Sequence, residues 1–414
     1  MHNNASKVFP RRSSHPGPGL FFQISLFLTA AGLLNGAASA QSVSGNQFNP
    51  SISLILNGQY AVYSNRAEDF EISGFLIDDE AGPIAEGFSL DESELVISAN
   101  IDDQYYGFVD VAFVEEAGGG TEVELEEAYF QTLNLPSGLT VKGGKFFSSI
   151  GYHNVFHAHT WHFADAPLAY QAMLGTTFAD TGLQLRWLAP MNRFLELGVE
   201  FFQGNSFPAA NDGGSAGAYS VFVKTGGDIG ISHSWKAGLS YLDYDALDRD
   251  GGEALADLTF AGEGDLFIAD FVWKWAENGN PRSRNFIIQS EYLQRDEHGQ
   301  VDFFNGVANE SGPYDLRQSG FYLQGIYQFR PRWRVGLRYD RLSSSNQLPA
   351  LSVVTPLSDD GRNPRRLTAM VDFSNSEFSR LRLQFSRDES SADSDTRVLL
   401  QYVMSIGAHG AHQF

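Results

Sequence analysis

Four histidines lie close together in one stretch of this sequence, residues 148–175 (SSIGYHNVFHAHTWHFADAPLAYQAMLG), out of ten in the whole chain. Imidazole is the commonest side-chain ligand of transition metals, and it suits Zn²⁺, Cu²⁺ and Ni²⁺. A nearby carboxylate would add a ligand or orient an imidazole. We therefore expect this stretch to bind a divalent metal. The predicted ligands are His153, His157, His159, His162 and Asp165.

The spacing of these histidines suits a metal site in two backbone conformations. In an extended chain His157 and His159 point the same way, whereas in a helix His153 approaches His157 and His159 approaches His162. The alternative is packing, because aromatic residues interleave the histidines and such a stretch would not stay exposed to water. The imidazoles would then be hydrogen-bonded parts of a buried loop. The aromatic residues are Tyr152, Phe156, Trp161 and Phe163.

Catalytic chemistry has little support in the residues. Ser148 or Ser149 could pair with His153 as nucleophile and base, but nothing in their spacing requires it. The chain has no cysteine, which excludes thiolate chemistry, and no Gly-rich phosphate loop. We expect no enzymatic activity and no required cofactor.

The first part of the chain, residues 1–40, has the pattern of a removable signal peptide. A basic start at Lys7–Arg12 precedes a short apolar stretch at Leu20–Leu34 and a small-x-small cleavage signal at Ala38–Ala40. A short polar lead, 41–50, follows. No later segment has the ~18 consecutive apolar residues of a membrane helix. The exported chain is therefore either soluble or a membrane barrel.

The remaining chain, 51–414, alternates between apolar and polar residues in segments of about ten. Ile52, Leu54 and Leu56 share one face of the first such segment, and Leu381, Leu383 and Phe385 alternate with polar neighbours near the end. The polar residues on the opposite face of this last segment are Arg380, Arg382, Gln384 and Ser386. This pattern predicts an all-β protein, a transmembrane antiparallel β-barrel of about sixteen strands.

The lengths of the connections favour the barrel over a soluble sandwich. Short connections alternate with long ones along the chain, as periplasmic turns and external loops do in outer-membrane barrels. The short connections are expected at 102–104, 135–137, 190–193, 330–332 and 375–377. The long loops are expected at 65–87, 148–180, 204–216, 244–264, 296–318 and 344–364. We expect the loop at 148–180 to fold into the lumen and constrict it.

The end of the chain supports an outer-membrane location. Apolar residues alternate through Leu400, Tyr402, Met404 and Ile406 towards a terminal Phe414. A last strand of this kind is the signal by which barrel-assembly machinery binds its clients. We therefore expect that machinery and the outer-membrane lipid to be partners of this chain.

Charged residues at alternating positions are expected to line the pore, where rings of charge set ion selectivity. The alternative is that they only solvate a water-filled interior. Acidic residues outnumber basic ones by 50 to 28, which favours cations weakly and excludes nucleic acid as a partner. The predicted pore-lining residues are Glu94, Glu122, Glu124, Glu126, Arg186, Arg334, Arg338, Arg380 and Arg382.

Several stretches resemble a family of Gram-negative proteins labelled zinc-regulated, or TonB-dependent, outer-membrane receptors. They are 49–64 (NPSISLILNGQYAVYS), 144–175, 226–241 (GGDIGISHSWKAGLSY) and 404–414 (MSIGAHGAHQF). The resemblance implies zinc uptake and assigns the histidines of 148–175 and Asp165 to zinc capture. More distantly, 124–151 is similar to phosphate-selective porins, a class of sixteen-stranded trimers, which implies a homotrimer.

Together these observations predict a passive outer-membrane channel for small solutes, with Zn²⁺ bound or transported at the histidine-rich loop. The alternative function is a TonB-linked or partner-gated receptor for a metal or a metal complex. A pore would conduct in planar bilayers, whereas a closed receptor would not.

Overall fold

The computed structural model describes residues 50–407, except 79–80, 116–119, 211–216, 251–257, 305–306, 350–356 and 358–360. The predicted signal peptide at 1–40, most of the polar lead and Phe414 lie outside these residues. Within the described part of the chain, no helix is both long and apolar enough to span a membrane.

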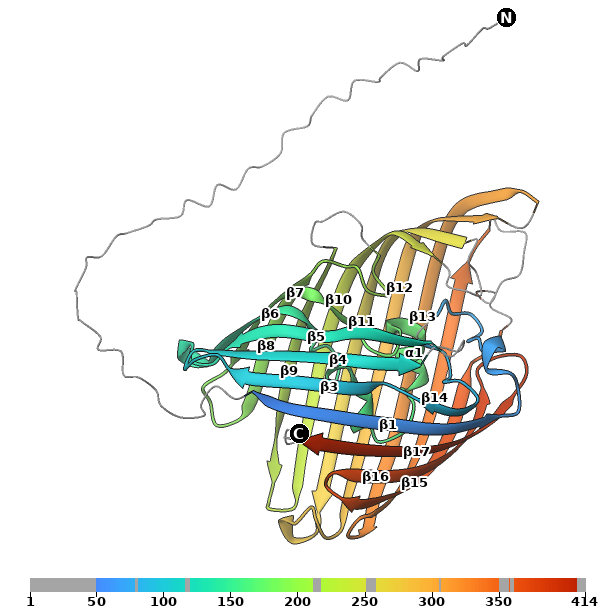
Figure 1. Ribbon diagram of the computed structural model, residues 1–414. Coiled ribbons are helices and arrows are strands. Elements are labelled where there is room, and N and C mark those ends of the chain that lie inside the picture. Colours follow the sequence, from blue (N-terminus) through green and yellow to red (C-terminus); the bar gives the residue numbers. More distant parts are fainter. Residues whose placement is uncertain are drawn as a thin grey trace, which may run out of the picture. The chain divides into compact units, whose positions relative to one another are not determined.

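Antiparallel strands make up most of the described chain (Figure 1). They are β1 (Ser51–Tyr63), β2 (Gly87–Leu90), β3 (Ser93–Asn100), β4 (Tyr105–Glu115), β5 (Thr121–Thr132), β6 (Leu139–Phe147), β7 (Ala179–Leu188), β8 (Phe194–Phe202), β9 (Ala218–Ile229), β10 (His233–Asp250), β11 (Leu258–Ala276), β12 (Asn285–Phe304), β13 (Asn309–Arg330), β14 (Trp333–Gln347), β15 (Arg365–Ser376), β16 (Ser379–Glu389) and β17 (Asp395–Gly407). The helical elements are α1 (Leu168–Leu174) and the 3₁₀ turns η1 (Ala67–Asp69), η3 (Pro136–Gly138), η4 (His153–Val155), η5 (Ala158–Thr160) and η7 (Glu277–Gly279).

The sheet closes on itself because β1 pairs with β17 as well as with the strand that follows it in sequence. That following strand is interrupted between β2 and β3, where the register on β1 changes by one residue, from Gly58↔Leu90 to Ile55↔Glu94. Counting β2 and β3 as one strand, the seventeen segments form a barrel of 17 − 1 = 16 strands. The predicted fold class is therefore confirmed.

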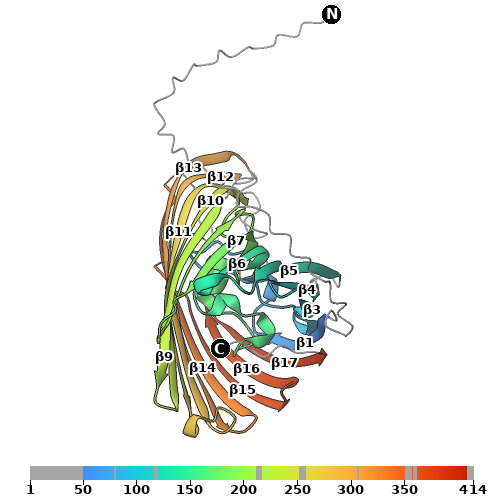
Figure 2. The same cartoon turned by 90° about the vertical axis from the view of Figure 1, so that its left-hand side faces the viewer.

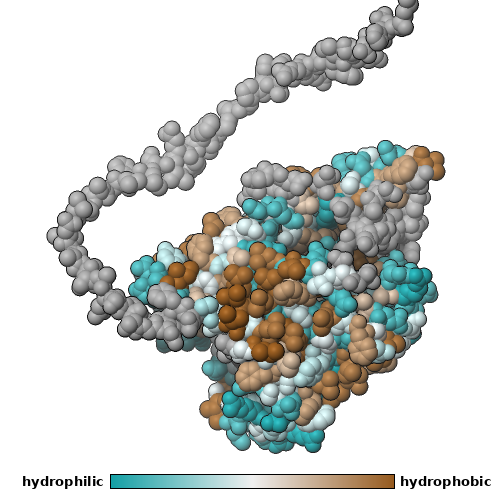
Figure 3. All heavy atoms as spheres, viewed as in Figure 1, coloured by the Kyte–Doolittle hydropathy of each residue, from teal (hydrophilic) through white to brown (hydrophobic). Residues whose placement is uncertain are grey.

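Alternation along the strands separates an outer apolar surface from a polar interior, as the sequence predicts. In β1, Ser53, Asn57 and Gln59 are buried, whereas Ile52 and Tyr60 are exposed on the outside. Figure 3 shows apolar side chains gathered over the middle of the wall that faces the viewer. The exposed apolar residues include members of nearly every strand, and this is the surface that a membrane barrel presents to lipid.

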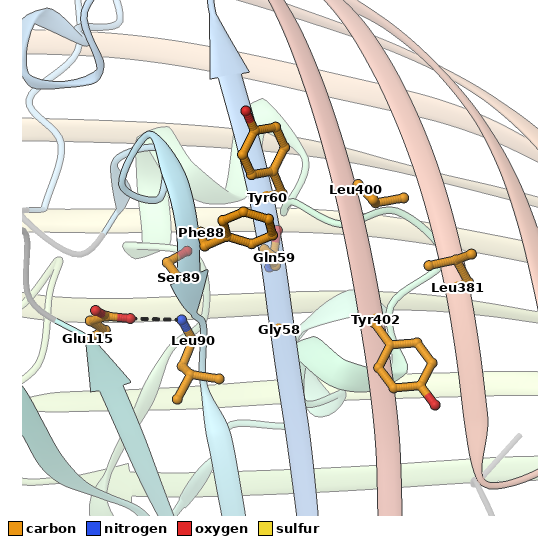
Figure 4. Close-up of a pocket in the computed structure, with 10 residues that line it drawn as sticks. All are labelled: Gly58, Gln59, Tyr60, Phe88, Ser89, Leu90, Glu115, Leu381, Leu400 and Tyr402. Atoms are coloured by element: carbon orange, nitrogen blue, oxygen red, sulfur yellow. Dashed lines mark hydrogen bonds between the residues drawn. The ribbon is translucent and has the colours of Figure 1, made fainter.

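One notch interrupts this outer surface next to β2 (Figure 4). Phe88, which is 86% exposed, packs against Tyr60 with ring centroids 4.6 Å apart. The backbone N–H of Leu90 donates a hydrogen bond to Glu115 at 3.0 Å. The notch encloses about 400 Å³ and its remaining walls come from β1, β16 and β17. Its apolar lining makes it part of the outer surface and not of the lumen.

Four of the six predicted long loops, 65–87, 148–180, 204–216 and 344–364, lie mostly between strands, but the other two are wrong. Residues 244–264 and 296–318 are mostly strand, because β10–β13 continue well past the outer apolar surface. In these extensions the polarity is inverted: Phe260 and Val301 point inwards and are buried, whereas Glu263 and Asp302 lie on the outside. The expected apolar-out pattern therefore stops, although the ladder of paired residues continues.

Candidate functional site

The segment between β6 and β7 lies inside the barrel, between opposing walls (Figure 2). Its two ends are held together by Asn154, whose side-chain amide donates to the carbonyls of Ser148 and Phe178 at 2.8 and 2.9 Å. The N–H of Phe178 donates back to Asn154 at 2.7 Å. One buried amide therefore closes the base of the segment, which we call the inner loop (148–178).

Apolar packing holds the far half of the inner loop. Every residue of α1 is buried, and Gly175 ends the helix with a φ of +62°. The helix packs in the largest apolar core of the described chain, together with Phe75 from the first loop and inward-facing Leu266 and Leu293. Deletion of a buried leucine side chain costs about 2–5 kcal/mol, so this core alone is enough to keep the loop inside.

Glu291 on β12 fixes the turn at the start of the inner loop. Its carboxylate accepts hydrogen bonds from the N–H groups of Tyr152 and His153 at 2.9 and 2.8 Å. It also accepts from the hydroxyls of Tyr170 and Tyr322 at 2.8 and 2.5 Å. A single buried carboxylate thus satisfies four donors, two of them backbone groups that no helix or strand would pair.

Asp165 joins the inner loop to the basic wall formed by β14–β17. Its carboxylate pairs with Arg338 and Arg366, each at 2.9 Å, and accepts from Gln384 at 2.7 Å. Burial would raise the pKa of Asp165, but the two guanidinium groups lower it from 3.8 to about 2. Asp165 therefore bridges two arginines, and both of its carboxylate oxygens are occupied by hydrogen bonds, so neither is available to bind a metal.

His157 meets the opposite, acidic wall formed by β3–β5. Its Nδ1 lies 2.8 Å from Glu126, and its Nε2 lies 3.0 Å from Glu127. Burial alone would lower the pKa of His157, but these two hydrogen bonds raise it well above its ordinary value. His159 is held nearby, with its Nδ1 2.7 Å from Glu94. Two of the predicted metal ligands therefore lie against carboxylates.

The other two histidines lie elsewhere. His153 packs against Trp161 and edge-to-face against Tyr170, with ring centroids 4.7 and 4.8 Å away. Burial together with Arg338 lowers the pKa of His153 from 6.5 to about 3. Burial, Arg334 and Lys274 lower the pKa of His162 well below its ordinary value. Both imidazoles are thus kept neutral beside positive charge, an environment that repels a metal cation.

The structure does not bring the five predicted ligands together. Among the residues it describes, one group has the geometry for a metal ion, and it contains His157 with Glu94, Asp110 and Glu126. The sequence did not identify Asp110 as a site residue. The outward valines on either side of it show that Asp110 faces the lumen, but they do not show which residues of the neighbouring strands and of the inner loop surround it. In the observed register it lies directly opposite Glu127, an unfavourable pairing of like charges.

A β-bulge explains why Glu126 and Glu127 both turn inwards. Asp110 pairs with Glu127 and Val111 with Leu125, so Glu126 is the extra residue on β5. Strict alternation would have sent one of the two glutamates to the outer surface. The bulge is therefore what concentrates carboxylates beside the inner loop.

The predicted pore-lining residues divide between two walls and several degrees of exposure. Glu94 is buried, Glu124 and Glu126 are partly buried, and Glu122 is exposed near the start of β5. Arg186 lies apart on β7, 3.7 Å from Glu196. The remaining predicted residues lie on the basic wall; they are Arg334, Arg338, Arg380 and Arg382. Arg338 and Arg382 are buried, and Arg334 pairs with Asp372 at 2.6 Å.

A cavity of about 990 Å³ lies below the inner loop, at the end of the barrel that carries the short turns. The loop forms its roof with residues from Tyr152 to His162, and the turns at 281–282, 331–332 and 376–379 form its rim. Its lining has five basic side chains and one acidic side chain, Glu377. The basic residues are Lys274, Arg282, Arg332, Arg334 and Arg380. We call this cavity the vestibule.

Outer-membrane proteins of known structure, among them a porin, have a similar fold. OmpTΔL8, a loop-deletion form of OmpT of Vibrio cholerae, has a TM-score of 0.54 at 9% sequence identity. An anion-selective porin from Comamonas acidovorans has a TM-score of 0.52 at 10% identity. Each match covers 86% of this chain and 99% of the other chain. An uncharacterised protein of Aquifex aeolicus (strain VF5) is 32% identical over 92% of this chain and 83% of its own length. The profile of a family described as "Putative beta-barrel porin-2, OmpL-like" matches residues 97–403.

The fold, the polar lumen and the inner loop define a porin-like channel of the outer membrane. Since the family profile covers most of the chain, this protein belongs to the beta-barrel porin-2 (OmpL-like) family. The predicted membership of the zinc-regulated, TonB-dependent receptors is therefore wrong. Outer-membrane transporters with a plugged lumen have about 22 strands, and sixteen strands make a ring too narrow for that architecture.

Proposed function

We propose that this protein is a passive channel through which small, negatively charged solutes cross the outer membrane. The observation that carries the proposal is the charge of the vestibule, whose lining holds five basic side chains, one of them (Arg334) paired with Asp372, against one acidic side chain. A cavity lined by one sign of charge raises the local concentration of the opposite ion. The inner loop above it acts as the constriction that limits solute size.

The opposite walls of the lumen support this proposal. The inner loop touches carboxylates through His157 and His159, and guanidinium groups through Asp165 and the carbonyl of Trp161. The loop therefore lies between a negative and a positive wall, and charges that line a pore set its selectivity. The porin from Comamonas acidovorans with the same fold is anion-selective.

Conductance in planar bilayers tests the channel and its preference in one experiment. In a KCl gradient we expect measurable single-channel steps and a reversal potential that lies closer to the equilibrium potential of chloride than to that of potassium. The double variant Lys274→Gln/Arg380→Gln should move the reversal potential towards the equilibrium potential of potassium, because both side chains line the vestibule. Arg365→Gln removes an exposed arginine that pairs with Glu389 outside the vestibule, and serves as the matched control. Absence of conductance, or a preference for potassium in the wild type, would refute the proposal.

Export and assembly are part of the same proposal. Residues 1–40 would direct the chain through the inner membrane, and Phe414 would present the last strand to the barrel-assembly machinery. OmpT of Vibrio cholerae, with a TM-score of 0.50, has been described in a trimer form. A homotrimer of this chain would be tested by light scattering on the detergent-extracted protein, where a monomer mass would exclude it.

A further inference from the structure

Three carboxylates and one imidazole from four different elements converge on the acidic wall. They are Glu94 on β3, Asp110 on β4, Glu126 on β5 and His157 on the inner loop, and one ligand atom of each lies within 4.8 Å of all the others. From Nδ1 of His157 the distances are 2.8 Å to Glu126, 3.4 Å to Asp110 and 3.8 Å to Glu94. Ligands about 2.1 Å from a tetrahedral ion lie roughly 3.4 Å apart, so small side-chain movements would complete the shell.

Several oxygens in this cluster have no hydrogen-bond partner. Asp110 is 0% exposed, and neither of its carboxylate oxygens accepts a hydrogen bond from the described residues, although one lies 3.4 Å from Nδ1 of His157. Glu94 is also 0% exposed, and its Oε2, the atom that faces His157, has none either. Burial of a carboxylate without partners costs several kcal/mol. Polar groups left in this way need an explanation, and a cation between them would provide one.

The partners that do exist orient the cluster in the way that metal ligands are oriented. Nε2 of His157 contacts Glu127 at 3.0 Å, which leaves Nδ1 directed at the three carboxylates. The same pattern, an imidazole that binds metal through one nitrogen and donates to a carboxylate through the other, recurs in metal sites. Glu94 is held by His159 through Oε1 at 2.7 Å, and its Oε2 is left for the cluster. Glu127 in turn accepts from the N–H of Phe147 at 3.1 Å.

We propose that Glu94, Asp110, Glu126 and His157 bind a divalent cation and so fasten the inner loop to the acidic wall. Three carboxylate oxygens and one imidazole nitrogen suit an ion of the Zn²⁺ or Mn²⁺ type better than Ca²⁺ or Mg²⁺, which prefer oxygen alone. Three carboxylates outweigh the charge of one imidazole, and the ion supplies the positive charge that the cluster lacks. This site goes beyond the proposed channel function and does not depend on conduction.

Calorimetric titration of Zn²⁺ into the refolded, chelator-treated barrel in detergent tests the site. We expect saturable 1:1 binding, weakened at least about 100-fold by Asp110→Asn or His157→Gln and about tenfold by Glu127→Gln. His162→Gln is the matched control, because it removes a buried imidazole of the same loop on the basic wall. Its binding should equal that of the wild type, and competition by Ca²⁺ should be weak.

A second measurement requires no variant and therefore does not depend on whether one folds. Co²⁺ added to the wild-type barrel should give visible d–d absorption bands that Zn²⁺ displaces. Absence of saturable zinc binding together with absence of these bands would overturn the proposal. Equal binding by Asp110→Asn and the wild type would also overturn it, as would equal loss in His157→Gln and His162→Gln.

Discussion

Replacement of Asp165 by asparagine should release the inner loop from the basic wall. Asp165 pairs with Arg338 and Arg366 at 2.9 Å, and both guanidinium groups are buried. Removal of one partner of a buried ion pair costs about 3–5 kcal/mol. Each arginine keeps a second carboxylate, Asp340 or Asp388, at 3.0 and 2.6 Å. We therefore expect a cost near the lower end, about 3 kcal/mol.

Hydrogen exchange measures this loss where it should occur. If local opening of the loop becomes about 3 kcal/mol easier, amides of residues 156–174 should exchange roughly 100-fold faster in Asp165→Asn. Strands on the far side of the barrel should be unaffected. Asp296→Asn is the matched control, because its partner Arg317 is 72% exposed and such pairs contribute at most about 1 kcal/mol. Equal exchange in Asp165→Asn and the wild type would show that Asp165 does not hold the loop.

The pH dependence of the same difference follows from the sign of the pKa shift. The pKa of Asp165 falls from 3.8 when the chain is unfolded to about 2 in the fold. A lowered carboxyl pKa contributes stability that is present above 3.8 and is lost as the pH falls through 2. Wild type and Asp165→Asn should therefore differ at pH 7 and become alike towards pH 2.

Two further substitutions test how the inner loop is built. His153→Phe keeps the ring contacts with Trp161 and Tyr170 but cannot be protonated. Because the pKa of His153 falls from 6.5 to about 3 in the fold, the free energy of unfolding measured in urea should fall less steeply below pH 6.5 in the variant than in the wild type, by up to about 1.4 kcal/mol per pH unit. Equal slopes would contradict a buried neutral imidazole. Gly151→Ala should cost about 2–3 kcal/mol, because Gly151 has a φ of +61° and a methyl group there would meet Tyr170 and Glu291. Gly230→Ala, at a φ of +64° with open space around it, should cost about 1 kcal/mol in the same measurement, and equal costs would mean that backbone strain alone decides.

The sequence by itself determined the barrel. Alternation of apolar and polar residues within a strand is a local property, since neighbouring side chains point to opposite faces whatever the strand pairs with. The positions of most turns follow for the same reason, because they interrupt the alternation. Where strands β10–β13 leave the apolar surface the alternation inverts, and there the sequence alone predicted loops in place of strands.

Only the tertiary structure decided which side chains meet inside the barrel. His157 and His162 are five residues apart, yet one lies among carboxylates and the other among cations, because the loop crosses from one wall to the other. Asp110 and Glu94 come from separate strands, and their contact with His157 depends on the register, on the bulge at Glu126 and on ring closure. Spacing along the chain carries no information on such contacts, since they join residues far apart in sequence.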